Sequence, residues 1–460
     1  MDAPKRISER SIWIGVTALL LAFIAVLAFS PRVLAGSEEA ETQRQLGIFY
    51  EVFRFVQQNY VDEDKVEAKR LVDGALKGLF QALDDPHSAY LNASEMQELN
   101  DTTTGQFGGV GLIISKVDQG VEVVSPIEDT PAYRAGVHAG DIITAIGEQS
   151  LVELSTDQVV QILRGEPGTT VTVTILRGRS LKFNLQLQRA MIEVPTVKMA
   201  MIPGDIGYLR IIQFTPLTPD RVREALKYFE RNRYRALVID LRSNPGGLLS
   251  AVVDVADYFI AGGPIVSTRS RVPAENHVFY ASKKETIVDP SLPIAVLINR
   301  GSASASEILA GALKDTGRAK LLGEKSYGKG SVQQVKRTDD AGFRLTMSRY
   351  YTPAGISIDK VGILPDIEVK EEELSQEEEK SLPALLEQGL TRDFVIAHPQ
   401  PSEQDIQQFI QELRERNISL RERLVRRLIS NEIDRTNDQP PVYDLEYDLA
   451  LQEAVKTLQK

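Results

Sequence analysis

Apolar residues recur at helical spacing in the first part of the chain. A stripe with spacings of three and four residues runs from Ile48 to Val56, and a second runs from Val72 to Leu83. An Asp-Asp-Pro sequence at residues 84–86 breaks the pattern. The spacing predicts a helical region within residues 43–98, and stripes of this kind are typical of core or partner-helix contacts.

Short β-rich runs punctuated by glycine occupy residues 104–189. Examples are VEVVSPI, DIITAIG and TVTVTILRG, and two short helical pieces interrupt them at residues 132–137 and 157–163. We expect a small β-rich domain here. From residue 191 the runs GDIGYLRIIQF, ALVIDLR and IAVLIN are nearly continuous in apolar residues, as in strands buried on both faces.

Helical segments at residues 221–232, 249–260 and 304–316 alternate with these strands and predict an α/β domain over residues 191–370, to which residues 43–98 contribute. Further helices are expected at residues 382–390, 402–416, 419–431 and 445–458. They make residues 371–460 a C-terminal helical region, for oligomerisation or for an adaptor protein. We interpret its mixed charges between Glu412 and Arg427 as a solvated helix face.

The N-terminus is expected to carry an export signal. Lys5, Arg6 and Arg10 precede an uncharged apolar run at residues 12–29, which is about the length that spans a bilayer. A small-residue cleavage site follows at residues 33–35. Residues 1–36 are therefore expected to be a signal peptide or a membrane anchor, with the body exported across the cytoplasmic membrane to a periplasmic or other extracytoplasmic location.

Composition narrows the chemistry. The 460 residues carry a formal net charge of -11, which argues against sequence-independent nucleic-acid binding. The chain has no cysteine, which excludes thiol nucleophiles, thiolate metal sites and disulfides. The four histidines are scattered along the sequence, and none lies in a motif that would identify it as the base of a serine catalytic triad.

The sequence GEKSYGKGSVQQ, from Gly323, allows three interpretations of Lys329. A phosphate-binding loop needs Ser or Thr after the lysine and then a helix, but Gly330 follows and SVQQVKR alternates like a strand. A Ser-x-x-Lys pair starting at Ser326 needs a helix, which the glycines disfavour by about 1 kcal/mol each. Ser326 therefore reads as a bystander. The third interpretation makes Lys329, on a strand, the base for a distant serine, with its pKa lowered by burial.

The run RGSASASEILAGAL offers that serine. A buried strand ends there and turns into a helix, which is where an α/β protein displays a nucleophile and where the helix N-terminus favours negative charge. Ser302, Ser304 and Ser306 are all candidates from the residues alone. Helix capping is the alternative role for all three.

Two resemblances extend this picture. Residues 104–189 resemble a PDZ domain, through the pattern A-x-x-A-G-x-x-x-G-D-x-I-x-x-I-x-G from Ala132 to Gly147. PDZ domains add an extended C-terminal peptide as a strand and hold its carboxylate with a glycine-rich loop. The resemblance places that loop at Gly109, Val110, Gly111 and Leu112, beside the helix from Asp157. A tight β-turn without a ligand is the alternative.

The motifs IDLRSNPGG, NRGSASASEILAGALKD, GEKSYGKGSVQQ and GILPDIEV follow in this order. Together they resemble the C-terminal processing peptidases, or tail-specific proteases, over residues 48–369. That resemblance implies a PDZ domain inserted between an N-terminal helical region and an α/β serine-protease core of the crotonase-like or ClpP-like type. It implies no metal and no cofactor.

Carried over motif by motif, the resemblance makes Ser304 the nucleophile, Lys329 the base and Gln333 the residue that orients the amine. The oxyanion hole would use the main-chain N–H groups of Ala305 and of Gly247, with Gly246 as the neighbour in doubt. Arg164 would sense occupancy of the PDZ domain by contacting the protease body, or else be a solvated charge before a turn.

The leading hypothesis is an exported serine endopeptidase that binds proteins with unstructured C-termini and cleaves through an acyl-enzyme. Its expected partners are those substrates, an adaptor protein, the membrane at the N-terminus, and further copies of the chain in a dimer or larger homo-oligomer. The alternative hypothesis is a PDZ-based binding scaffold with an inactive protease domain.

Overall fold

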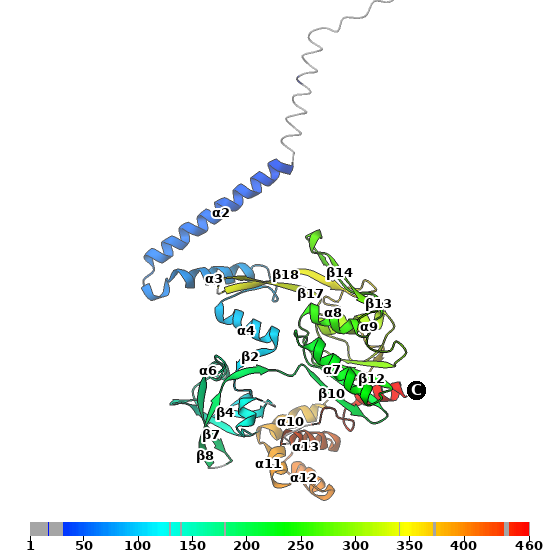
Figure 1. Cartoon of the computed structure of the whole chain (residues 1–460). Coiled ribbons are helices and arrows are strands. Elements are labelled where there is room, and N and C mark those ends of the chain that lie inside the picture. The colour runs from blue at the N-terminus through cyan, green and yellow to red at the C-terminus, as the bar shows by residue number, and fades with distance from the viewer. Residues whose placement is uncertain are drawn as a thin grey trace, which may run out of the picture. The chain divides into compact units, whose positions relative to one another are not determined.

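The computed structural model describes Thr17 and residues 31–127, 130–138, 140–178, 181–339, 341–370, 374–436 and 441–459. It divides into two compact units, Met1–Asn92 and Ala93–Lys460 (Figure 1). The apolar run at residues 12–29 lies outside the described residues, apart from Thr17. Within the described part of the chain, no helix combines the length and the apolar character needed to cross a bilayer.

The first unit has helices over both predicted apolar stripes. Its elements are α2 (Pro31–Asn59), the 3-10 helix η1 (Glu63–Lys65), α3 (Ala68–Gln81) and β1 (Ala89–Leu91). The apolar side chains stay exposed within the unit: Phe55 is 68% exposed and Leu79 is 61% exposed. Amphipathic helices draw most of their stability from packing of the apolar face, so these faces favour contact with another surface.

A six-stranded sheet forms the centre of the second unit. Its strand order is β10 (Val197–Ile202), β11 (Ile206–Ile211), β12 (Ala236–Asp240), β15 (Ile294–Ile298), β16 (Lys320–Gly323) and β19 (Ile367–Glu368). All neighbours are parallel except β10 and β11. Parallel strands place their carboxyl ends at one edge, so the loops after β12, β15 and β16 meet there.

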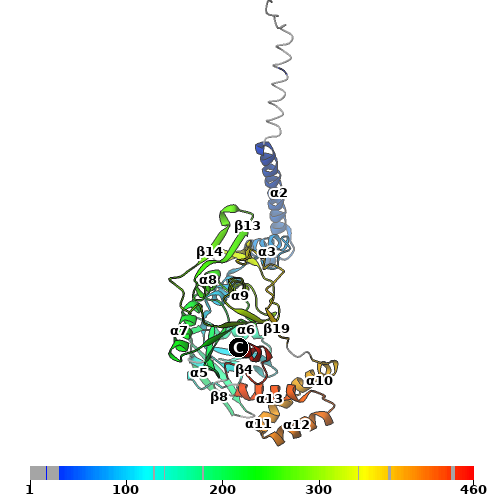
Figure 2. The same ribbon diagram turned by 90° about the vertical axis from the view of Figure 1, so that its right-hand side faces the viewer.

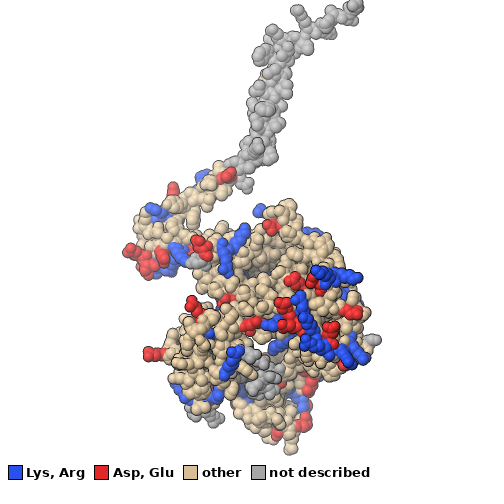
Figure 3. Space-filling model, in the orientation of Figure 1, with Lys and Arg blue, Asp and Glu red and all other residues tan. Residues whose placement is uncertain are grey.

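Helices cover both faces of this sheet (Figures 1 and 2). Leu237 and Ile239 pack with α7 (Thr218–Arg231), α8 (Leu249–Asp257) and α9 (Ala305–Asp315). Val238, between them in the strand, packs on the opposite face against α14 (Leu449–Leu458). This alternation explains why the central strands are almost continuously apolar. Figure 3 shows acidic and basic side chains mixed in the region of α7, where Arg221 bonds both Glu193 and Glu224.

A second sheet carries the hairpin predicted after Lys329. It contains β13 (Gly262–Ser270), β14 (His277–Ser282), β17 (Ser331–Thr338) and β18 (Ala341–Tyr351), and β17 pairs antiparallel with β18. The 3-10 helix η2 (Pro273–Glu275) joins β13 to β14. In β18 the apolar residues Phe343, Leu345 and Met347 alternate with polar ones, as in a strand of a sheet with one covered face.

The β-rich domain has the order β3 (Leu112–Val117), β4 (Gly120–Pro126), β5 (Ile142–Ile146), β7 (Thr170–Arg177) and β8 (Leu181–Gln188), with β6 (Gln149–Ser150) beside β5. Its helices are α5 (Pro131–Arg134) and α6 (Thr156–Leu163). Helix α4 (Ala93–Thr104) precedes it, and β2 (Gln106–Gly109) pairs with β9 (Ala190–Glu193).

The C-terminal helices are α10 (Gln376–Glu387), α11 (Leu390–Ala397), α12 (Glu403–Glu415) and α13 (Glu422–Thr436). The single helix expected at residues 382–390 is wrong. Gly389, with φ of 62°, separates two helices there, and a capping box at Ser375 starts α10 before the expected position. The last helix starts later than expected, because Asp448 caps α14.

Candidate active site

Ser304 lies at the turn between β15 and α9. Its φ of 55° and ψ of -114° fall in a region that non-glycine residues rarely adopt. A strained turn from strand to helix holds a serine side chain at the surface of an α/β fold, and such strain clusters at functional sites. Ser304 is 9% exposed.

The two neighbouring serines have structural contacts. Ser302 is fully buried, and its hydroxyl donates to the carbonyl of Leu241 at 2.8 Å. Ser306 is also fully buried, and its hydroxyl donates to the carbonyl of Asn244 at 3.0 Å. Both hydroxyls therefore fix the loop, whereas Ser304 is the serine of the three that reaches solvent. Burial thus separates three candidates that are nearly equivalent in the sequence.

Glu307, in the first turn of α9, joins the serine turn to the lysine loop. Its Oε2 accepts the main-chain N–H groups of Ser304 and Lys329, both at 2.8 Å. Its Oε1 accepts the N–H of Gly328 and the hydroxyl of Ser326, both at 2.6 Å. Burial raises the pKa of Glu307, and these four hydrogen bonds oppose that rise. One carboxylate therefore holds the main chains of both proposed catalytic residues.

The sequence interpretation missed Glu307 and misjudged Ser326. Ser326 is buried, donates to Glu307 and accepts the N–H of Ile363 at 2.6 Å, so it is not a bystander. A signal for Glu307 was available, because Ser304 and Glu307 have the Ser-x-x-Glu spacing of a capping box. In the structure the main-chain half of that box forms, from the N–H of Ser304 to the carboxylate.

Lys329 lies in the loop between β16 and β17, two residues before the strand, so its expected strand position is wrong. Burial, with a contribution from the nearby positive charge of Arg344, lowers the pKa of Lys329. The hydrogen bonds among the described residues do not include one between the side chains of Ser304 and Lys329. The shared contact to Glu307 is what brings the two residues together.

Gln333 lies on β17, at the bulge after Val332. Its amide donates to the hydroxyl of Ser331 at 2.8 Å and to that of Thr346 at 3.4 Å. The contact with Ser331 shows that the two residues belong to one polar cluster on the strand that follows Lys329.

The Asn-Pro-Gly-Gly turn packs directly on the serine turn. A methyl group at Gly246 would lie 2.7 Å from the Cβ of Ser304, and Gly246 has φ of 105°. The N–H of Gly246 donates to the side chain of Asn244 at 2.9 Å. The described hydrogen bonds include none from the N–H of Gly247 or of Ala305. Those two donors fit the expected oxyanion hole better than Gly246 does.

Asn244 holds this turn in place. It is fully buried, its amide donates to the carbonyl of Ile211 at 2.8 Å, and its own carbonyl accepts the N–H of Ala303 at 3.0 Å. A buried amide with satisfied polar groups specifies one geometry. Asn244 is a second positioning residue that the sequence interpretation did not name.

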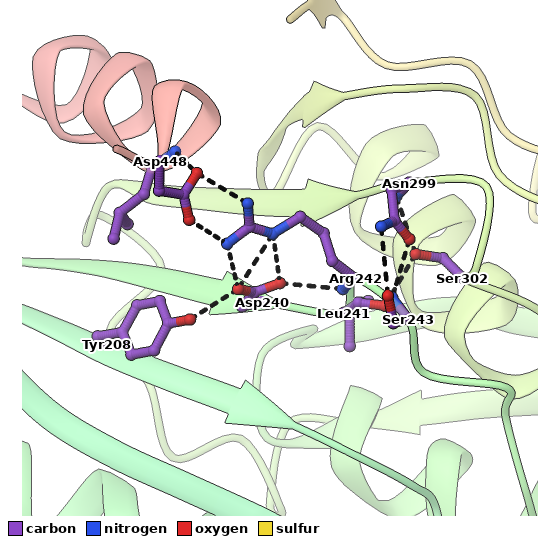
Figure 4. Close-up of polar contacts among 9 residues, drawn as sticks. Tyr208, Asp240, Leu241, Arg242, Ser243, Asn299, Ser302 and Asp448 are labelled. Atoms are coloured by element: carbon purple, nitrogen blue, oxygen red, sulfur yellow. Dashed lines mark hydrogen bonds and ion pairs between the residues drawn. The ribbon is translucent and has the colours of Figure 1, made fainter. Parts of the chain in front are cut away.

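A buried ion-pair network fixes the start of the same loop (Figure 4). Arg242 bonds Asp240 at 2.6 Å and Asp448, the cap of α14, at 2.6 and 2.8 Å. Tyr208 donates to Asp240 at 2.7 Å. Burial alone would raise the pKa of Asp240, but Arg242 and the hydroxyl of Tyr208 hold it below its usual value. The C-terminal helix is thereby linked to the turn that carries Gly246.

In the β-rich domain, β3 pairs with β4 alone among the described strands and is an edge strand beside α6. The loop before it is fixed: Gly109 pairs with Ala190, and the carbonyls of Val110 and Gly111 accept N–H groups of the domain. Gly111 has φ of 81°, and Leu112 begins the strand. An edge strand with a fixed glycine loop at its start can accept an added peptide strand.

Arg164, at the end of α6, contacts α4. Its guanidinium pairs with Asp101 at 3.0 Å and lies over the ring of Phe107 at 4.7 Å. The side chain is 27% exposed. These contacts favour a connection between α6 and the rest of the unit over a freely solvated charge.

Comparison with known proteins bears on this site. Residues 205–369 match Peptidase family S41, residues 122–177 match a PDZ domain, and residues 30–95 match the N-terminal domain of the activating protease CtpB. A carboxy-terminal-processing protease of Bartonella bacilliformis is 41% identical over 369 residues, which cover 79% of this chain and 83% of that protein. The chain belongs to the carboxy-terminal processing protease family.

Other carboxy-terminal processing proteases are similar over comparable lengths. The CtpA protease of Bacillus subtilis is 30% identical over 360 residues, covering 77% of this chain and 76% of that protein. The solved photosystem II D1 C-terminal processing protease is 31% identical, with a TM-score of 0.42, and covers 70% of this chain and 92% of that chain. Membership makes the chain a serine-type peptidase with a PDZ domain and a Peptidase family S41 core.

Proposed function

We propose that this chain is an exported endopeptidase that captures protein C-termini with its PDZ domain and cleaves them with a dyad of Ser304 and Lys329. The observation that carries the proposal is the Glu307 carboxylate, which binds the main-chain N–H groups of both residues. Preorganised main-chain geometry of this kind is what nucleophilic catalysis requires.

In the proposed reaction, the neutral amine of Lys329 takes the proton of the Ser304 hydroxyl while Oγ attacks the scissile carbonyl. The N–H groups of Ala305 and Gly247 donate to the oxyanion that forms. The Lys329 ammonium then protonates the leaving amine as the C–N bond breaks. A water molecule, deprotonated by Lys329, then attacks the acyl-enzyme. As the bond between the acyl group and Ser304 Oγ breaks, the Lys329 ammonium returns that proton to Oγ, which releases the acid product and restores Ser304 and the neutral amine.

Two features of the site support lysine as the base. Burial and Arg344 lower the pKa of Lys329, which raises the fraction of neutral amine near pH 7. Gln333 lies on the strand that follows the lysine, and we assign it the role of orienting the amine directly or through Ser331.

The PDZ domain supplies substrate recognition in this proposal. The edge of β3 adds the substrate as a further strand, and the loop of Gly109, Val110, Gly111 and Leu112 holds its terminal carboxylate. Arg164 would report occupancy through Asp101 of α4. Amidation of the substrate's C-terminus should therefore lower kcat/KM, and equal kcat/KM for acid and amide substrates would contradict carboxylate recognition.

The N-terminal region supports the proposed location and assembly. The basic residues and the apolar run at residues 12–29 support export to an extracytoplasmic location. The exposed apolar faces of α2 and α3 support assembly with further copies or with an adaptor protein. A mass measurement of the exported body that showed only monomer at micromolar concentration, with and without cellular partners, would contradict the assembly.

The decisive experiment measures degradation of an unstructured protein by the wild type, Ser304→Ala, Lys329→Ala and, as control, the exposed Ser250→Ala. We expect each dyad variant to lose activity by about a thousandfold or more and the control to retain it. Equal cleavage by all four would exclude the dyad. Binding of C-terminal peptides by a wild type that cleaves nothing would favour the scaffold alternative.

A further inference from the structure

A cavity of about 410 Å³ lies between the carboxyl ends of the central strands and the C-terminal helices. Its basic lining residues are Arg242, Arg300, Lys370, Arg421, Arg423 and Arg427. Only two acidic residues, Glu324 and Asp448, line it among the residues that the structure describes. This is a concentrated positive charge in a chain whose formal net charge is -11.

Several of these cations already have partners. Arg242 is bound by Asp240 and Asp448, Arg421 pairs with Glu378 at 2.8 Å, and Arg300 pairs with Glu324 at 3.2 Å. These pairs leave no carboxylate of the described lining free to neutralise a further cation.

Arg427 has no such partner among the residues that the structure describes. It lies on α13, half-buried, and its guanidinium makes no ion pair or hydrogen bond within the described residues. The adjacent Arg423 lies over the ring of Tyr447 at 5.6 Å, so its guanidinium is held at the wall of the cavity. The planar guanidinium fork of arginine suits phosphate oxygens particularly well.

The cavity also borders three loops of the proposed active site. Arg242 and Ser243 precede the Gly246 turn, Asn299 and Arg300 precede Ser304, and Glu324 precedes Lys329. Ser243 and Asn299 are joined directly, because the N–H of Ser243 donates to the Asn299 side chain at 2.8 Å. A ligand in the cavity would therefore touch the start of each loop.

We propose that this arginine-lined cavity is a binding site for a phosphate-bearing anion, and that its occupancy changes the rate of proteolysis. The coupling rests on the proposed function, whereas the binding does not. The phosphate could belong to a soluble molecule or to a phospholipid headgroup, and the two sources are separated by the probes below.

Binding is tested on the full chain carrying Ser304→Ala, with inorganic pyrophosphate titrated by calorimetry at constant ionic strength. We expect saturable binding, weakened about tenfold or more by Arg427→Ala because a charged hydrogen bond is lost, and partly retained in Arg427→Lys. Arg414→Ala, an exposed arginine on α12, is the matched control. No saturation by pyrophosphate at about 10 mM together with no Arg427-dependent binding of the anionic vesicles described below, or equal binding by the Arg427 and Arg414 variants, would overturn the site.

The second arm compares vesicles of phosphatidylglycerol with vesicles of phosphatidylcholine. Binding to the anionic vesicles that depends on Arg427, without binding of pyrophosphate, would assign the site to a headgroup. Coupling is tested on the chain with Ser304 intact, where saturating pyrophosphate should change kcat/KM at least about threefold, a change in the range of ordinary allosteric coupling. Binding without any change in kcat/KM would overturn the coupling and leave the site.

Discussion

The region around Ser304 and the region around Arg242 both lie at the carboxyl ends of the central strands, but they contain different kinds of residue. On the side of α9, small residues and main-chain N–H groups surround Ser304, and a Cβ added at Gly246 would collide with the Cβ of Ser304. On the side of α14, long charged side chains surround Arg242. One short loop, residues 240–247, serves both sides. The geometry around Ser304 therefore depends on Gly246 having no side chain. The geometry around Arg242 depends instead on its pairing with carboxylates.

The largest expected effect comes from adding one methyl group on the serine side. Gly246→Ala places a Cβ 2.7 Å from that of Ser304 and 2.8 Å from the carbonyl oxygen of Ala303, at a φ that alanine avoids. We expect loss of cleavage by more than about a hundredfold, because displaced reacting groups are this costly. Gly262→Ala, with open space around it, is the control and should cleave normally. Normal cleavage by both variants would contradict the claim that the site at Ser304 requires a residue without a side chain at position 246.

Removing the charge that joins the two loops should cost somewhat less. Glu307→Gln keeps the shape but replaces one acceptor oxygen with an NH2 group, a donor that faces the N–H and O–H donors already pointing at it. We expect kcat to fall by about ten- to a hundredfold with KM little changed, and stability to fall by about 1–3 kcal/mol. Glu230→Gln, exposed on α7, is the control. A purely structural role would leave the pH profile of the residual activity unchanged.

The pH dependence of kcat/KM should report Lys329. Only the neutral amine can act as a base, so kcat/KM should rise with pH up to the lysine pKa, which burial and Arg344 set below its usual value of about 10.4. Arg344→Gln removes a positive neighbour, raises that pKa and should move the rise to higher pH. Lys336→Gln, exposed on β17, should not. A flat profile would argue against a lysine base.

A substitution in the ion-pair network of Arg242 should have the smallest effect on activity but a measurable effect on stability. Asp448→Asn keeps the cap of α14 but leaves Arg242 with one carboxylate, so we expect a loss of about 1–3 kcal/mol and only a several-fold fall in kcat. Because Asp240 has a lowered pKa, its contribution to stability is present at neutral pH and lost as pH falls through that value. Asp205→Asn removes an exposed pair and should change unfolding little.

The sequence predicted the elements whose signal is local. Continuous apolar runs located β12 and β15, and the alternation after Lys329 located the β17–β18 hairpin. The start of α14 and the break between α10 and α11 were missed, because single residues, Asp448 and Gly389, decide them against a continuing apolar pattern. A cap or a left-handed glycine changes the chain's direction without changing its periodicity.

The sequence predicted those candidate site residues that lie in recognisable motifs. It missed those whose role depends on contacts between residues distant in the sequence. Ser304 and Lys329 came from motifs, but the role of Glu307 depends on donors 19 to 22 residues further along the chain. The distinction between Ser304 and its neighbours depends on burial, which three alternating serines do not reveal. In the sequence Arg427 was interpreted as a solvated charge, because the sequence of α13 does not indicate that Arg427 lines a cavity at the ends of the central strands.

The left-handed turn at Ser304 also bears on how natural substrates could be found. A serine with φ of 55° costs the fold on the order of 1 kcal/mol that glycine would not. Ser304→Gly should therefore unfold at a higher temperature than the wild type while being unable to form an acyl-enzyme. With Ser304 as the proposed nucleophile, this position would be one where selection for activity holds the protein below its attainable stability. The same variant would be a robust bait, intact in its peptide-binding domain, for capturing proteins that the enzyme normally consumes.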